Sequence, residues 1–185
     1  SQTNVSCFGG NNGSASVTTT GGTFPYTYSW SNGATTSQVS NLTAGNYSVI
    51  ITDNNGCSST AAVLITEPSA MAVAVSIDDT ICPNQNTTIS ANASGGTNPY
   101  TYFWQPNVGF GNSQIVNPSS TTTYTAIVTD ANGCTTTGVV TISVYNQNIA
   151  LTAIATPGIC AGQSATVSAI SNSNNIVSYY WSNNL

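Results

Sequence analysis

The feature that most constrains this chain of 185 residues is that it repeats itself. Three cysteines and three tryptophans recur at intervals of 74–78 residues: Cys7, Cys82, Cys160, Trp30, Trp104 and Trp181. A further pair, Cys57 and Cys134, closes matching Asp-x-Asn-Gly-Cys segments. A fixed long period is typical of tandem modules. We therefore predict two complete units, residues 1–67 and 68–145, and the first half of a third, residues 146–185, whose natural chain continues past Leu185.

Each unit reads as a set of short β-strands. Valine, isoleucine, tyrosine and threonine are abundant in the sequence, and these residues favour strands. No segment places apolar residues at helical spacing over the length of a helix. The chain is therefore expected to be all-β.

Alternation of side chains predicts which residues form the core of each unit. Tyr28 and Trp30 fall on one face of a strand, because side chains alternate with a period of two. A strand ending in an inward tryptophan, followed by a tyrosine corner such as residues 42–47, is typical of immunoglobulin-like sandwiches. The expected core residues are Trp30, Trp104, Trp181, Tyr47 and Tyr124. The fold predicted is a tandem array of immunoglobulin-like Greek-key β-sandwiches.

The charges exclude several classes of function. The formal net charge is −5, and the chain contains no lysine, arginine or histidine. Nucleic-acid binding needs cations that replace the counterions of phosphate. Histidine-based acid–base chemistry, a catalytic triad and a lysine Schiff base are likewise excluded. No apolar run is long enough for a membrane helix. We expect no catalytic residues, no cofactor, no nucleic acid and no membrane insertion.

Five cysteines in a chain without histidine suggest disulfides and an oxidising, extracellular location. Metal binding is the alternative, but no Cys-x-x-Cys spacing occurs. With two cysteines in each complete unit, we expect Cys7 to pair with Cys57 and Cys82 with Cys134. Cys160 is then left unpaired, because its unit is truncated.

Other polar and aromatic residues suggest binding or modification. The adjacent Asp78 and Asp79 suggest a calcium site, or simply turn capping by their own backbone. Aromatic residues near the strand starts, Phe24, Tyr26 and Tyr100, are either core residues or a stacking platform for sugar rings. Asp79-Thr80-Ile81 resembles the short acceptor motif for O-glycosylation of proteins exported by type-IX-secreting bacteria, which makes Thr80 the predicted glycosylation site.

The first unit resembles the SprB repeat of very large surface adhesins in gliding bacteria. The matching text is Cys-Phe-Gly-Gly at residues 7–10, Gly-Gly to Trp-Ser-Asn-Gly at residues 21–33, residues 42–47, and Thr-Asp-Asn-Asn-Gly-Cys at residues 52–57. The cysteine segments of the second and third units depart from this start and look more like PKD-type or immunoglobulin-like modules.

The resemblance implies a secreted, non-enzymatic segment of a cell-surface adhesin or filament, with type IX secretion, a role in gliding motility and glycosylation. Its expected partners are neighbouring repeats, other copies in a fibre, and surface polysaccharide or other glycans. The alternative is a carbohydrate-binding module or a spacer of a secreted multidomain enzyme.

Overall fold

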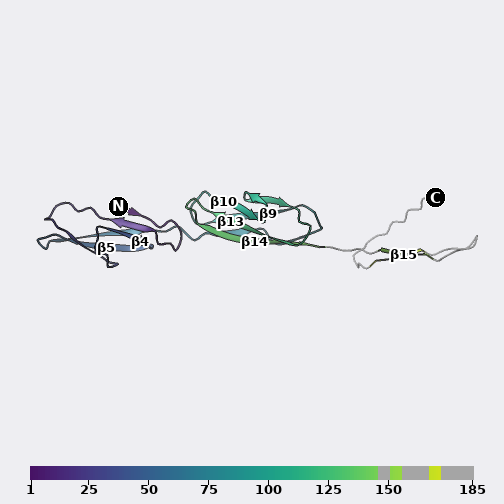
Figure 1. The fold of residues 1–185 in the computed structure, drawn as a ribbon, viewed down its shortest axis with the longest axis horizontal. Coiled ribbons are helices and arrows are strands. Elements are labelled where there is room, and N and C mark those ends of the chain that lie inside the picture. The colour runs from purple at the N-terminus through teal and green to yellow at the C-terminus, as the bar shows by residue number, and fades with distance from the viewer. Residues whose placement is uncertain (146–150, 156–166, 172–185) are drawn as a thin grey trace, which may run out of the picture.

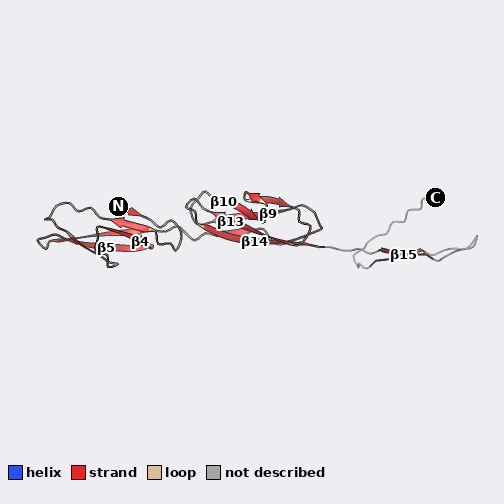
Figure 2. Ribbon diagram, viewed as in Figure 1, coloured by secondary structure: helices blue, strands red, loops and turns tan. Residues whose placement is uncertain are grey.

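A computed structural model describes residues 1–145, 151–155 and 167–171. Every regular element within these residues is a β-strand, which confirms the all-β prediction (Figure 2). No helix that could span a membrane occurs in the described part of the chain.

Six strands form the first sandwich. One sheet has the order β1-β2-β4 and the other the order β3-β5-β6. The strands are β1 (Gln2–Thr3), β2 (Gly13–Ser16), β3 (Thr27–Trp30), β4 (Gln38–Leu42), β5 (Gly45–Thr52) and β6 (Ser58–Ile65). The strands on either side of each turn are antiparallel, and β5 pairs with β6 along its full length. The two sheets bury one core between them.

Eight strands form the second sandwich. One sheet has the order β11-β10-β13-β14-β8 and the other the order β12-β9-β7. The strands are β7 (Ala72–Val75), β8 (Asp79–Ile81), β9 (Thr87–Ser94), β10 (Thr101–Gln105), β11 (Gly109–Phe110), β12 (Ser113–Val116), β13 (Thr122–Thr129) and β14 (Thr135–Val144). Strand β8 joins the end of β14 in parallel. In the first sandwich the segment before Cys7 lies beside the end of β6 in a similar way, since the amide of Val5 donates to the Thr66 carbonyl at 2.9 Å.

Each sandwich has its own core, which contains the tryptophan of β3 in the first sandwich and that of β10 in the second. Trp30 is 5% exposed and Trp104 is fully buried. Each indole N–H donates to a backbone carbonyl, that of Thr36 or that of Gly111, so neither buried polar group is left unsatisfied. The alternating pattern along β13, in which Tyr124 is buried, matches a strand with one face toward the core.

The strand ends are held by the turns that the sequence predicts. The hydroxyl of Tyr47 donates to the carbonyl of Thr43 at 3.1 Å, which is the geometry of a tyrosine corner. Asn55-Gly56 and Asn132-Gly133 connect β5 to β6 and β13 to β14. Both glycines have φ near +84°, a conformation that glycine adopts without steric cost.

The two sandwiches lie end to end along the longest axis of the molecule (Figure 1). Strand β6 runs toward the second sandwich, and β13 runs back toward the first. The hairpin of the second sandwich, residues 130–134, therefore meets the end of the first. Beyond the second sandwich, β15 (Leu151–Ala155) and β16 (Val167–Ser171) form an antiparallel pair.

Candidate functional site

The candidate functional site is the junction between the two sandwiches, where a disulfide joins Cys7 to Cys134. Their Cα atoms are 5.8 Å apart, within the usual range for a disulfide. The side-chain amide of Asn132 also crosses the junction and donates to the Ser6 carbonyl at 2.9 Å. A covalent bond and a neighbouring hydrogen bond thus fix one sandwich against the next.

This connectivity corrects the pairing expected from the sequence. Cys57 is free and exposed, so the expected Cys7–Cys57 disulfide is wrong. Cys57 precedes the eight residues of β6, whereas Cys7 lies near the opposite end of that strand, where the Gly9 amide donates to Glu67. At about 3.3 Å per residue, a strand of this length separates the two cysteines by roughly 26 Å.

The second expected pair, Cys82–Cys134, is wrong for the same reason. Cys82 is also free and exposed. It follows β8, which pairs with the last residues of β14, while Cys134 immediately precedes the ten residues of β14. Each sandwich therefore carries its two cysteines at opposite ends, and the disulfide found among the described residues joins cysteines of adjacent sandwiches.

The hairpin that presents Cys134 is organised by one carboxylate, Asp130. Its Oδ1 atom accepts from the amides of Cys134 and Asn132, and its Oδ2 atom from the amide of Thr97, each at 2.9 Å. Burial raises the pKa of Asp130, but these backbone hydrogen bonds outweigh it and leave the pKa below its ordinary value. Asp130 stays ionised at neutral pH and holds the cysteine in place.

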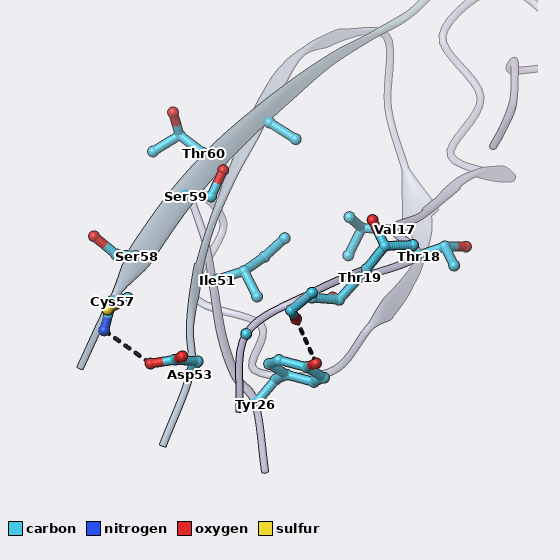
Figure 3. A pocket seen from close by; sticks show the side chains of 14 residues that line it. Val17, Thr18, Thr19, Tyr26, Ile51, Asp53, Cys57, Ser58, Ser59 and Thr60 are labelled. Carbon is cyan, nitrogen blue, oxygen red and sulfur yellow. Dashed lines mark hydrogen bonds between the residues drawn. The ribbon is translucent and has the colours of Figure 1, made fainter. Parts of the chain in front are cut away.

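The first sandwich contains a close copy of this hairpin around Asp53. Its carboxylate accepts from the amides of Cys57, Asn55 and Thr23 at 2.8, 2.9 and 3.0 Å. The bond from Thr23, followed by that from Cys57, lowers the pKa of Asp53. Figure 3 shows the bond between Cys57 and Asp53. Cys57 is therefore held as Cys134 is, but without a partner cysteine.

Two glycines, Gly95 and Gly96, bring the connecting segment between β6 and β7, residues 66–71, close to the hairpin of the second sandwich. The Gly96 amide donates to the Ser69 carbonyl at 2.8 Å. A Cβ on Gly96 would lie 2.6 Å from Met71 Cγ and 2.7 Å from Asp130 Oδ2, so only glycine fits between the connecting segment and the carboxylate. The hydroxyl of Tyr100 donates to the Gly95 carbonyl and holds this turn from the other side.

At the outer end of the first sandwich, the residues around the Asp53 hairpin form a groove of about 350 Å³ (Figure 3). We call it the end groove, and it is lined by residues 17–22 and 57–61 with Tyr26, Ile51 and Asp53. In the second sandwich, β7 fills this position. A Cβ on Gly138 would meet the side chains of Val75 and Val73 at 2.6 and 3.1 Å. The counterpart of Gly138 by sequence is Ala61, which lines the end groove.

The aromatic residues proposed as a sugar platform have structural roles in this arrangement. Tyr26 and Tyr100 are half-buried, and the hydroxyl of Tyr26 donates to the Gly21 carbonyl at 2.6 Å. Phe24 is exposed, but its ring meets that of Tyr26 edge-on, at 87°. The two rings therefore present no shared flat face for a sugar to stack on.

The acidic pair and the predicted glycosylation site lie together on the second sandwich. Asp78 accepts from the Thr141 amide at 2.7 Å, and Asp79 accepts from the Thr80 amide and the Thr87 hydroxyl, both at 2.8 Å. Both aspartates thus bond to their own surroundings. Among the described residues, no group of three or more acidic or cysteine side chains is placed to hold a metal ion. Thr80 is exposed.

Two of the predicted residues, Cys160 and Trp181, lie outside the described residues. The sequence contains a feature that argues against the expected disulfides Cys7–Cys57 and Cys82–Cys134. Each hairpin cysteine comes at the start of a long final strand, so it must lie a full strand length from the end of its own unit. That placement already favours a bond between units over one within a unit.

Comparison with known families gives a match to the SprB repeat at residues 1–35 and 74–109. Each matched segment contains the first cysteine and the core tryptophan of its unit. The first segment agrees with the resemblance noted from the sequence. The second was expected to be closer to PKD-type or immunoglobulin-like modules, yet it matches the same SprB family. No curated protein matches the chain.

The chain also matches solved structures at low sequence identity. The chain is 14% identical to DIP-gamma IG1+IG2, covering 66% of this chain and 84% of that one, with a TM-score of 0.36. The chain is 13% identical to the fibronectin(III)-like modules of Clostridium thermocellum CbhA, covering 72% of this chain and 84% of that one, with a TM-score of 0.37. It is 13% identical to extracellular domains 3–5 of Drosophila OTK, covering 65% of this chain and 51% of that one, with a TM-score of 0.34.

Proposed function

We propose that this chain, two segments of which match the SprB repeat, is a repeat segment of a surface protein and serves there as a non-enzymatic stalk of an adhesin or filament. The finer proposal is that the parent protein is exported by type IX secretion, carries an adhesive role at the surface of a gliding bacterium, and contacts surface polysaccharide or other glycans.

The observation that carries this proposal is the disulfide between consecutive sandwiches. A chain of sandwiches in which each contacts only its neighbours forms an extended rod. A flexible connection would let such a rod bend at every junction. The Cys7–Cys134 disulfide and the Asn132–Ser6 hydrogen bond restrict that bending. The arrangement therefore suits a stalk that keeps a fixed length and transmits tensile force.

The composition supports a role outside the cell. Disulfides persist in oxidising compartments, and a bond between modules is consistent with an extracellular location. The absence of lysine and arginine leaves trypsin-like proteases no cleavage site. The exposed Thr80 next to Asp79 supports O-glycosylation as a further part of the proposal.

Antibodies against the purified chain test the surface location. We expect them to label intact, unpermeabilised cells of the native organism, and to lose that labelling in a mutant of the type IX secretion machinery. Labelling that requires lysis of the cells would overturn the proposal. Labelling that survives loss of type IX secretion would overturn its export route.

The adhesive role needs a separate measurement on the same cells. Deletion of residues 1–145 from the parent gene, with the rest left in frame, is expected to lower attachment and gliding speed on glass. A matched strain with Asn54→Ala alone controls for handling and expression, because Ala131 stands at the equivalent position of the second hairpin. Unchanged attachment in the deletion strain, with the shortened protein still at the surface, would contradict an adhesive role.

A further inference from the structure

Two cysteines of the described residues, Cys57 and Cys82, are free and exposed, and they lie at opposite outer ends of the joined pair of sandwiches. Each is the sequence counterpart of a cysteine that is bonded at the junction. Cys57 corresponds to Cys134, and Cys82 corresponds to Cys7. The two outer ends are thus the two complementary halves of the bond that the junction contains.

The backbone around Cys57 already has the bonded geometry. In both hairpins the aspartate amide donates to the cysteine carbonyl at 2.9 Å, and the cysteine amide donates back to the aspartate Oδ1. In both, the asparagine side-chain amide donates to a threonine hydroxyl at 3.0 Å. Asn132 makes one bond more, to the Ser6 carbonyl across the junction. Asn55 has the same position and makes no equivalent bond within the described residues.

The backbone around Cys82 matches that around Cys7. The Cys7 carbonyl accepts from the amide three residues later, that of Gly10, at 2.9 Å. The Cys82 carbonyl accepts likewise from the amide of Gln85, at 3.1 Å. Each cysteine therefore opens a similar turn at the far end of its sandwich, with its side chain available to a neighbour.

The connecting segment that packs beside Cys134 at the junction has no counterpart beside Cys57 among the described residues. Gly96 donates its amide to the Ser69 carbonyl of the connecting segment, whereas its counterpart Gly22 has no such bond among the described residues. The end groove beside Gly22 occupies the position that β7 fills in the second sandwich. The outer end of the first sandwich is therefore shaped to receive the end of another repeat together with the extended segment that follows it.

We propose that Cys57 and Cys82 are half-sites for further inter-repeat disulfides, each taking the complementary cysteine of another repeat of this type docked end to end. A repeat docked on Cys57 presents a cysteine of the Cys7 type, and one docked on Cys82 presents a hairpin cysteine. The result is a rod in which every junction is covalently closed. This inference names the partner within the proposed stalk and so rests on the proposed function.

The bond forms by thiol–disulfide exchange with a small disulfide such as oxidised glutathione. The Cys57 thiolate attacks oxidised glutathione, forms a mixed disulfide and releases one glutathione thiolate. The thiolate of the partner cysteine then attacks the Cys57 sulfur and releases the second. Two protein thiols are oxidised to one disulfide, and one oxidised glutathione is reduced to two thiols.

A second copy of this chain carries both complementary ends and serves as the probe. Two variants of the 185-residue chain are prepared, both with Cys160→Ser: one with Cys82→Ser, which retains Cys57, and one with Cys57→Ser, which retains Cys82. Each is incubated alone and in an equimolar mixture in a glutathione buffer. Dimers are separated without reductant and digested with pepsin, because the chain has no lysine or arginine for trypsin to cleave.

We expect the mixture to give a dimer linked through Cys57 and Cys82, and each variant alone to stay largely monomeric. Random pairing of equally reactive thiols would instead make Cys57–Cys82 dimers only half of all dimers. A heterodimer share at or below half would overturn the inference. Absence of any dimer at the highest soluble concentration would also overturn it.

A second pair of variants tests whether the hairpin recognises its partner beyond the thiol. Asn55→Ala removes the side chain whose counterpart Asn132 bonds across the junction, and loss of one hydrogen bond should lower the heterodimer equilibrium constant by about fivefold. Asn54→Ala is the matched control, because Ala131 stands at that position in the bonded hairpin. Equal dimer formation by both variants, with unchanged circular dichroism, would contradict a specific docking surface.

This test and that of the proposed function fail separately. Purified chains that pair at random would leave the surface labelling of cells untouched. Cells that label only after lysis would leave the pairing of Cys57 with Cys82 intact.

Discussion

Cys7 of the first sandwich is bonded to Cys134 of the second, across 127 residues of sequence. The bond ties the beginning of one repeat to the hairpin of the next, so it encloses most of both cores. The two cysteines come together because strands β6 and β13 both end at the junction. The covalent link therefore follows from the order in which the repeats are stacked.

Loss of this bond is expected to destabilise the pair of sandwiches. In the chain-entropy description, closing a loop of this length stabilises the folded state by about 5 kcal/mol. Cys7→Ser should therefore lower the urea midpoint and also increase the angular freedom between the sandwiches. The measurements are urea unfolding and small-angle X-ray scattering. Cys82→Ser is the control, since Cys82 is free in the monomer. Equal midpoints for both variants would contradict a stabilising junction.

Two equivalent glycines allow the connecting segment to be tested on its own. Gly22 and Gly96 both have positive φ, +74° and +61°, so alanine strains the backbone at either position. At Gly96 the new Cβ would also meet Met71 and Asp130 within 2.7 Å, whereas at Gly22 its nearest neighbour is 3.2 Å away. We expect Gly96→Ala to lower the melting temperature more than Gly22→Ala does. The reverse order would show that the segment does not pack as described.

Acid should weaken both hairpins. The pKa values of Asp53 and Asp130 are lowered in the folded state by backbone hydrogen bonds. The unfolded chain therefore takes up protons at a higher pH than the folded chain does. The stability that these carboxylates contribute is present above about pH 4 and is lost as pH falls through the folded-state values. Urea midpoints at pH 7 and pH 3 measure the effect.

Asparagine substitutions provide the control for the acid prediction. Asp53→Asn and Asp130→Asn keep the shape of the side chain but remove its charge. Both variants should be less stable than the parent at pH 7 and should lose less stability on acidification. A parent midpoint that stays constant from pH 7 to pH 3 would contradict the role given to these carboxylates.

Added salt should change stability very little. The chain has no lysine, arginine or histidine, so no side-chain ion pair can form that salt would screen. Five acidic residues spread along the chain repel one another weakly. We expect melting temperatures at low and moderate sodium chloride to agree closely. A large shift in either direction would indicate a charge interaction that this account lacks.

Much of this arrangement could be predicted from the sequence, and the reasons are local. The alternation around Trp30 and Trp104 indicates buried strands, and the Asn-Gly turns place the hairpins. Tyr47 lies where a tyrosine corner requires it. These features depend on side-chain period and backbone conformation, both of which a sequence displays directly.

The disulfide pairing was missed because it depends on the relation between units. Counting two cysteines in each unit suggests a bond inside it, as for Cys7 with Cys57. The lengths of β6 and β14 make such a bond impossible, since they hold the cysteines of one unit at opposite ends. The stacking direction of the sandwiches then decides which cysteines meet, and no residue pattern within a single repeat specifies that direction.

The most direct test is a disulfide map of the oxidised chain. The protein is alkylated under non-reducing conditions, digested with pepsin, and the linked peptides are sequenced by mass spectrometry. We expect a peptide pair joining Cys7 to Cys134, with Cys57 and Cys82 alkylated in the monomer. Peptides joining Cys7 to Cys57 and Cys82 to Cys134 would contradict this expectation, because each sandwich would then be closed upon itself.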